Sequence, residues 1–183
     1  TDVCIPGIME QIERAGVHSG DSMAVYPAQH LDQALINQIV DYTRRIAKGL
    51  NVKGVLNIQY IVVNGELHVI EVNPRSSRTV PFISKVTGIN MVEYATRIAL
   101  GETLESLGLP TGLVPARPHV AVKAPVFSFS KMGLVEIALG PEMKSTGEVM
   151  GIGRTYADAL FKAIHGANMR IPDKGNILMT VAD

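Results

Sequence analysis

Side chains that could bind a metal ion and side chains that could bind phosphate follow one another in residues 69–75, Val-Ile-Glu-Val-Asn-Pro-Arg. Glu71 offers a carboxylate that can bridge two cations, and Asn73 offers a neutral amide oxygen. Magnesium prefers such oxygen ligands and keeps positions for water and substrate phosphates. Arg75 and Arg78 follow, and guanidinium groups suit phosphate oxygens during transfer. The pattern indicates phosphoryl transfer; the alternative is an exposed strand end with solvated arginines.

Two β-rich segments, 55–63 and 66–72, must position these side chains, and Asn64-Gly65 between them is a strong hairpin signal. The register matters because a slip of one residue moves every side chain to the other face. A two-residue turn would place Ile58 opposite Glu71 and mix polar with apolar residues on both faces. We therefore predict a three-residue turn, with Gly65 in the left-handed position of a bulge.

The bulged turn would separate the two faces of the hairpin. It pairs Val62 with Glu66, Gln59 with Val69 and Asn57 with Glu71. The polar face then carries Asn57, Gln59, Glu71 and Asn73, and the apolar face carries Leu56, Ile58, Tyr60, Val62, Ile70 and Val72. This grouping makes Gln59 a third candidate metal ligand, beside Glu71 and Asn73.

Helical spacing of apolar residues predicts helices over 5–15, 32–48, 91–100, 103–107 and 155–165. Asp32 and Asn90 can cap two of them. Prolines become frequent between Pro110 and Pro141 and predict loops with short strands, such as 119–123. Residues 175–181 look like a strand that begins a further domain.

Composition restricts the class of protein. With 183 residues, 46% of them apolar, the chain can bury a core and form one domain or one large lobe with a tail. Its 17 basic residues balance 17 acidic ones, so no global field attracts nucleic acid. Apolar runs are too short for a membrane span, and the single Cys4 fits a reducing cytosol. We expect a soluble cytoplasmic protein, and the missing initial methionine suggests a piece of a larger chain.

Three segments together resemble one known family. Residues 69–82 look like the signature of the large chain of carbamoyl-phosphate synthase, an ATP-grasp enzyme. Residues 15–22, Ala-Gly-Val-His-Ser-Gly-Asp-Ser, resemble its nucleotide-contacting segment, and residues 140–151 resemble a further segment. The resemblance covers about residues 5–168. It implies an α+β fold, the C-terminal lobe of an ATP-grasp domain, with a mainly antiparallel sheet and flanking helices.

The resemblance also implies a domain division and a reaction. The family's large chain has two homologous halves, and this sequence is similar to the second, which phosphorylates carbamate. Residues 1–165 would form the C-terminal part of that ATP-grasp domain, and residues 166–183 would start the C-terminal allosteric domain. The products would be carbamoyl phosphate and ADP, for arginine and pyrimidine biosynthesis.

Site residues follow from the resemblance residue by residue. Gln59, Glu71 and Asn73 would bind two Mg²⁺ or Mn²⁺ ions, with Glu71 bridging them. ATP would contact Gly16, Val17, His18, Ser19, Gln59 and Glu71. Arg75 and Arg78 would be catalytic, orienting the phosphates and the carbamate.

The implied partners are ATP, carbamate, the remainder of the large chain and a glutamine amidotransferase small subunit that supplies ammonia. We expect the isolated chain to be inactive, because no nucleotide-covering lobe precedes Thr1 and transfer needs groups on both sides of the phosphates. Two alternatives stay open. One is another ATP-grasp ligase, against which residues 140–151 argue; the other is a non-catalytic scaffolding fragment.

Overall fold

The computed structural model describes residues 2–128, 138–169, 171–172 and 174–176. The first half of the chain contains β1 (Cys4–Ile5), β2 (Glu10–Gln11), β3 (Ala24–Tyr26), α1 (Gln33–Gly49), β4 (Asn57–Val63) and β5 (Glu66–Asn73). The second half contains α2 (Thr79–Thr87), α3 (Met91–Ala99), β6 (Gly112–Leu113), β7 (Val120–Val126), β8 (Gly147–Gly153) and α4 (Tyr156–Gly166). Among these described elements, no helix is both long and apolar enough to cross a bilayer.

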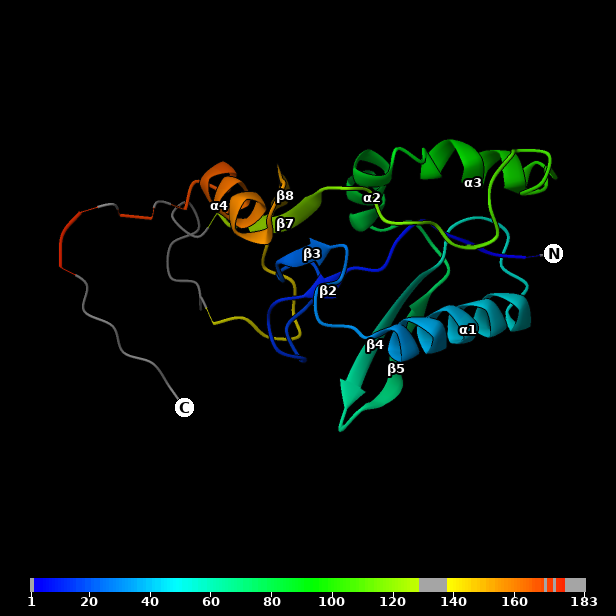
Figure 1. Cartoon of the computed structure of the whole chain (residues 1–183), viewed down its shortest axis with the longest axis horizontal. Coiled ribbons are helices and arrows are strands. Elements are labelled where there is room, and N and C mark those ends of the chain that lie inside the picture. The colour runs from blue at the N-terminus through cyan, green and yellow to red at the C-terminus, as the bar shows by residue number, and fades with distance from the viewer. Residues whose placement is uncertain (1, 129–137, 170, 173, 177–183) are drawn as a thin grey trace.

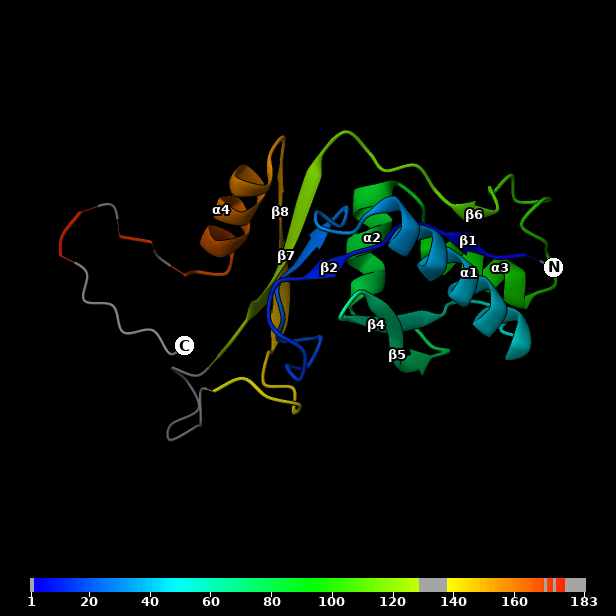
Figure 2. The ribbon, with the colours of Figure 1, turned by 60° about the horizontal axis from the view of Figure 1, so that its bottom comes forward.

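Strands pair mainly in antiparallel fashion (Figure 1). β2, β3, β7 and β8 form a four-stranded antiparallel sheet, β4 and β5 form a hairpin, and β1 and β6 form a short parallel pair. Helix α1 lies beside the hairpin, and α4 packs against β7 and β8 (Figure 2). The fold is therefore a mixed helix and sheet structure with mainly antiparallel sheets, as the sequence predicts.

Strand β7 separates two hydrophobic clusters by the alternation of its side chains. Val122 and Ala124 pack with Ala159 and Ala163 of α4. Ala121 packs on the opposite face, with residues of α2 such as Phe82. Residue 123 shares the face of residue 121, so the α2 side of the sheet carries a lysine, Lys123.

Glycines in β8 allow α4 to approach the sheet closely. A Cβ atom at Gly151 would lie 2.5 Å from the backbone nitrogen of Ala163, and one at Gly153 would lie 2.7 Å from that of Ala159. Ala159 and Ala163 are themselves fully buried. The contact between helix and strand is thus made almost directly between backbones.

Side-chain caps begin three of the helices, and the two caps predicted from the sequence, Asp32 and Asn90, are confirmed. Asp32 caps α1 by accepting from Leu35 N, and Asn90 caps α3 by accepting from Glu93 N. Thr155 caps α4 in the same way. The helix predicted over 155–165 is confirmed as residues 156–166. Helix α2 and strand β8 were not predicted. Pro81 near the start of α2 hid the helical pattern, and the glycines of β8 are unfavourable in strands.

Two predicted helices are wrong. Residues 5–15 contain only the end of β1 and the two residues of β2, with irregular backbone around them. Gly7 lies between the two strands and packs closely on Tyr26, where a Cβ would be 2.5 Å from Cε2. Pro6-Gly7 disfavours a helix, and the strand pairings replace its hydrogen bonds. Residues 103–107 form consecutive turns. The strand predicted over 175–181 falls mostly on residues 177–181, which lie outside the described residues.

We expect Gly151→Ala to lower the free energy of unfolding by about 1–3 kcal/mol, because the added methyl must push α4 away from β8. Urea denaturation followed by circular dichroism measures the change. Gly147→Ala is the matched control on the same strand, since its Cβ would meet only Val126 Cβ at 3.9 Å. Equal stability of the two variants would contradict the close packing described here.

Candidate functional site

The hairpin turn differs from the predicted one. Asn64 and Gly65 both adopt positive φ, 52° and 83°, and Val63 lies opposite Glu66, so the turn has two residues and the predicted three-residue turn is wrong. This is the conformation that Asn-Gly favours in tight hairpins. The extra residue of the hairpin is Ile70 in β5. Gln59 lies opposite Glu71 and the next residue, Tyr60, lies opposite Val69, so Ile70 has no partner on β4.

This register shift, rather than a bulged turn, brings the polar side chains of the hairpin to one face. Gln59 lies opposite Glu71 and Asn57 lies opposite Asn73, so the predicted pairs of Gln59 with Val69 and Asn57 with Glu71 are wrong. All four polar side chains nevertheless share one face, as expected. Ile70, predicted for the apolar face, is the extra residue of β5 and is 54% exposed.

Glu71 is the centre of the polar cluster. Gln59 Nε2 donates to Glu71 Oε1 at 2.5 Å, and Asn73 Nδ2 donates to the same oxygen at 2.8 Å. One carboxylate and two amides are a donor set that suits a hard divalent cation once the amide oxygens turn inward. In the part of the chain that the structure describes, no three His, Cys, Asp or Glu residues converge.

Residues 18–22 form a tight loop beside this cluster. Ser19 Oγ accepts from Gln59 Nε2 at 3.1 Å. His18 faces its own loop, since its Nδ1 accepts from Gly20 N at 3.0 Å and its backbone nitrogen donates to Gly140 O at 2.8 Å. Of the four residues predicted to contact ATP here, the structure brings only Ser19 to the hairpin cluster. Gly16 and Val17 lie in the preceding turn.

Arg78 connects the three segments that carry the family resemblance. Its Nη2 donates to Ser145 Oγ at 2.7 Å, to Met143 Sδ at 3.0 Å and to Gly20 O at 3.4 Å. Arg75 is exposed at the rim of the site, and its Nη1 donates to Ser76 O at 3.0 Å. The two arginines therefore have different surroundings, one between loops and one in solvent.

Asp21 is a buried charge to which sequence reasoning gave no role. It is 0% exposed, and its carboxylate accepts from the backbone nitrogens of Lys144 and Ser145, each at 2.8 Å. Burial alone would raise the pKa of Asp21, but the hydrogen bonds from Ser145 and Lys144 outweigh it and hold the pKa below its ordinary value of 3.8. Asp21 thus joins residues 15–22 to residues 140–151.

A buried lysine is the second missed residue. Lys123 is 2% exposed, and its Nζ donates to Ser19 O at 3.0 Å and lies 3.9 Å from Glu148 Oε2. Burial lowers the pKa of Lys123, which Glu148 partly offsets, and burial raises the pKa of Glu148, which Lys123 partly offsets. A lysine inside an otherwise apolar strand was the signal that could have revealed this pair.

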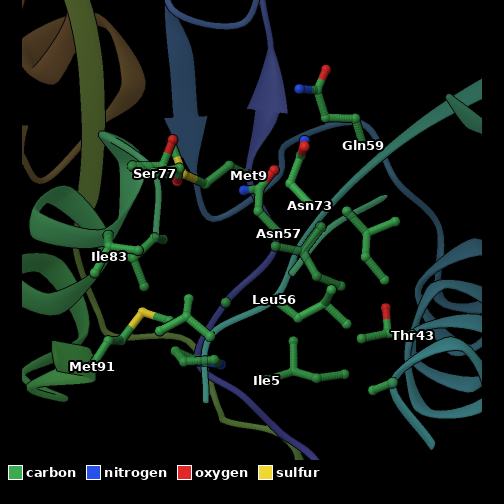
Figure 3. A pocket seen from close by; sticks show the side chains of 18 of the residues that line it. Ile5, Met9, Thr43, Leu56, Asn57, Gln59, Asn73, Ser77, Ile83 and Met91 are labelled. Carbon is green, nitrogen blue, oxygen red and sulfur yellow. The ribbon is translucent and has the colours of Figure 1, made fainter. Parts of the chain in front are cut away.

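A cavity of about 1390 Å³ opens beside the polar cluster. Its polar end includes Asn57, Gln59, Asn73 and Ser77, and its apolar end includes Ile5, Leu56, Ile83 and Met91 (Figure 3). Lining residues come from the hairpin, α1, α2, α3 and the 18–20 loop. The cavity therefore combines a few polar side chains with an apolar wall, as nucleotide and cofactor sites commonly do.

Solved structures show which class of fold this is. The biotin carboxylase domain of a single-chain bacterial carboxylase has a TM-score of 0.58 at 24% identity, covering 79% of this chain and 38% of that one. N5-carboxyaminoimidazole ribonucleotide synthetase from Thermus thermophilus has a TM-score of 0.61 at 18% identity, covering 92% and 47%. These neighbours place the chain in the ATP-grasp class of folds.

Sequence comparison identifies the family. Residues 2–107 match the family described as carbamoyl-phosphate synthase L chain, ATP binding domain. Over 181 residues the chain is 58% identical to the carbamoyl phosphate synthase large chain of Thermoanaerobacter sp. (strain X514), covering 99% of this chain and 17% of that protein. The chain belongs to the carbamoyl-phosphate synthase large-chain family, and it spans about a sixth of the length of that relative.

We expect Asp21→Asn to lower the free energy of unfolding at pH 7 by about 1–3 kcal/mol, because a buried backbone donor loses its acceptor. The pKa of Asp21 is depressed, so its stabilisation is complete above 3.8 and is lost as pH falls through the folded-state value. Wild type and variant should therefore converge in acid.

Urea denaturation at several pH values measures this convergence. Asp41→Asn is the control, because the Asp41 side chain is 62% exposed. A difference between wild type and Asp21→Asn that stayed constant down to a pH of about 2 would contradict the assignment.

Proposed function

We propose that this chain provides the metal- and phosphate-binding edge of an ATP-dependent ligase that transfers the γ-phosphoryl group of ATP to carbamate. The observation that supports this most directly is the convergence of Gln59 and Asn73 on Glu71, with Ser19 hydrogen-bonded to Gln59. The products are carbamoyl phosphate and ADP. The activity belongs to the whole large chain, of which this chain has about a sixth of the length.

Glu71, Gln59 and Asn73 would hold two Mg²⁺ or Mn²⁺ ions, with Glu71 between them. Such ions neutralise phosphate charge and orient the phosphates for in-line transfer. Arg75, exposed at the rim, binds phosphate oxygens. Arg78 orients the phosphates and the carbamate, and its contacts with Gly20 O and Ser145 Oγ hold its guanidinium between the two loops. Phosphoryl transfer needs no side-chain nucleophile, so no residue is assigned as one.

The choice of carbamate as acceptor rests on similarity to the second half of the large chain. The short connection between Gln59 and Glu71, the Gly-Val-His-Ser sequence at 16–19 and residues 140–151 support it. Residues 1–165 then belong to the ATP-grasp domain, and 166–183 begin the allosteric domain. A glutamine amidotransferase small subunit and the rest of the large chain supply ammonia and carbamate, in the cytosol.

We expect Glu71→Gln to weaken Mn²⁺ binding to the chain by more than about 100-fold, because loss of a ligand exceeds the ~10–100-fold effect of outer-shell partners. Electron paramagnetic resonance of free Mn²⁺ measures the affinity. Glu66→Gln is the matched control at the hairpin tip, where the Glu66 side chain is 81% exposed. Equal Mn²⁺ affinity of both variants would favour a scaffolding fragment.

Carbamoyl phosphate should bind the Mg²⁺-loaded chain at least about tenfold more tightly than acetyl phosphate or inorganic phosphate, about 1.4 kcal/mol. Arg75→Met should remove much of this binding, whereas Arg45→Met on α1, 73% exposed, should not. Isothermal titration calorimetry measures both. Equal affinity for the three phosphates would reject carbamate as the acceptor and leave the ligase class standing.

A further inference from the structure

We infer that Lys123 is a positioning residue for the metal site, acting through Ser19 on the amide of Gln59. This inference rests on the proposed function, since it concerns the ligand that Gln59 provides. Two contacts in series carry it. Lys123 Nζ donates to Ser19 O at 3.0 Å, and Ser19 Oγ accepts from Gln59 Nε2 at 3.1 Å.

The amide of Gln59 must be oriented before its oxygen can serve a cation. Its nitrogen has two acceptors here, Glu71 Oε1 and Ser19 Oγ. A cation would bind to the Glu71 carboxylate. The amide nitrogen of Gln59 could not then stay turned toward Glu71, because its N–H groups would point at the cation. Ser19 Oγ is then the acceptor that remains for the amide nitrogen of Gln59. This hydrogen bond holds the amide so that its oxygen faces the metal.

Ser19 needs a separate support because no regular element holds it. It lies in the loop before β3, and its carbonyl points to the sheet face of Lys123. The serine hydroxyl and its own carbonyl are on one residue, so fixing the carbonyl restricts where the hydroxyl can lie. Lys123 reaches this carbonyl from the central strand β7, which is a rigid base.

Stability alone does not explain a lysine at this position. Lys123 is almost fully buried, and its ion-pair partner Glu148 lies at 3.9 Å, with Glu148 Oε2 unbonded among the described residues. A buried pair with imperfect hydrogen bonding is commonly no better than an apolar replacement. The contact with Ser19 O gives the buried ammonium a role that an apolar side chain could not have.

Mn²⁺ affinity, measured by electron paramagnetic resonance, tests the inference. The reference is Glu148→Gln, and the test variant is Lys123→Met/Glu148→Gln, which removes the ammonium together with the charge of its ion-pair partner. We expect about tenfold weaker Mn²⁺ binding, the low end for an outer-shell partner. Ser19→Ala should give a similar loss. Lys162→Met, at a 51% exposed lysine that contacts a backbone carbonyl on β8, should leave the affinity unchanged.

A double-mutant cycle separates positioning from general destabilisation. If Lys123 acts through Ser19, adding the Lys123 change to a Ser19→Ala/Glu148→Gln background should weaken Mn²⁺ binding no further. Losses that multiply would overturn the inference. Wild-type affinity in Ser19→Ala would also overturn it, even if the Lys123 variant failed to fold. No response to Glu71→Gln would instead reject the metal site itself, and the inference with it.

Discussion

Two hydrogen bonds meet at one oxygen of the Glu71 carboxylate, and the bond from Gln59 exists only in one register of the β4–β5 hairpin. The Asn64-Gly65 turn alone would place Ile58 opposite Glu71, and the polar side chains would then lie on opposite faces. The additional residue Ile70 shifts β5 by one position and brings Gln59 opposite Glu71. A bulge beside a site re-aims side chains in this way, here at the expense of leaving Ile70 54% exposed.

The remaining parts of the site are loops, and charged groups hold them in place. Asp21 accepts from the backbone of residues 144 and 145, while Lys123 donates to the backbone of residue 19. Arg78 donates to both segments. Loops lack ladder hydrogen bonds, so their conformations depend on such side-chain contacts. Buried charges are expensive unless paired and hydrogen-bonded, which explains why Asp21 and Lys123 meet backbone partners.

Local signals predicted the local parts of the fold. Helical spacing of apolar residues predicted α1, α3 and α4, with capping residues named for the first two. The Asn-Gly pair predicted the hairpin, and the separation of polar from apolar residues predicted its polar face. The position of the bulge could not be predicted, because it depends on how β5 packs, whereas a bulged turn satisfied the same facial pattern. The strands at 4–5 and 10–11 depend on partners more than ten residues away. Asp21 and Lys123 escaped notice because burial of a charge is decided by tertiary contacts.

The two faces of the four-stranded sheet pack against different partners, and β7 carries a different kind of side chain on each face. On the α4 side, small residues let helix and strand backbones touch, with Ala159, Ala163 and Gly151 leaving no room for other groups. On the other side, the same strand carries the long side chain of Lys123, whose Nζ donates to Ser19 O. Because side chains alternate along β7, Val122 and Ala124 pack against α4, while Lys123 between them lies on the opposite face of the sheet. In a helix, successive side chains point in directions around the helix axis, so neighbouring residues could not serve two opposite faces in this way.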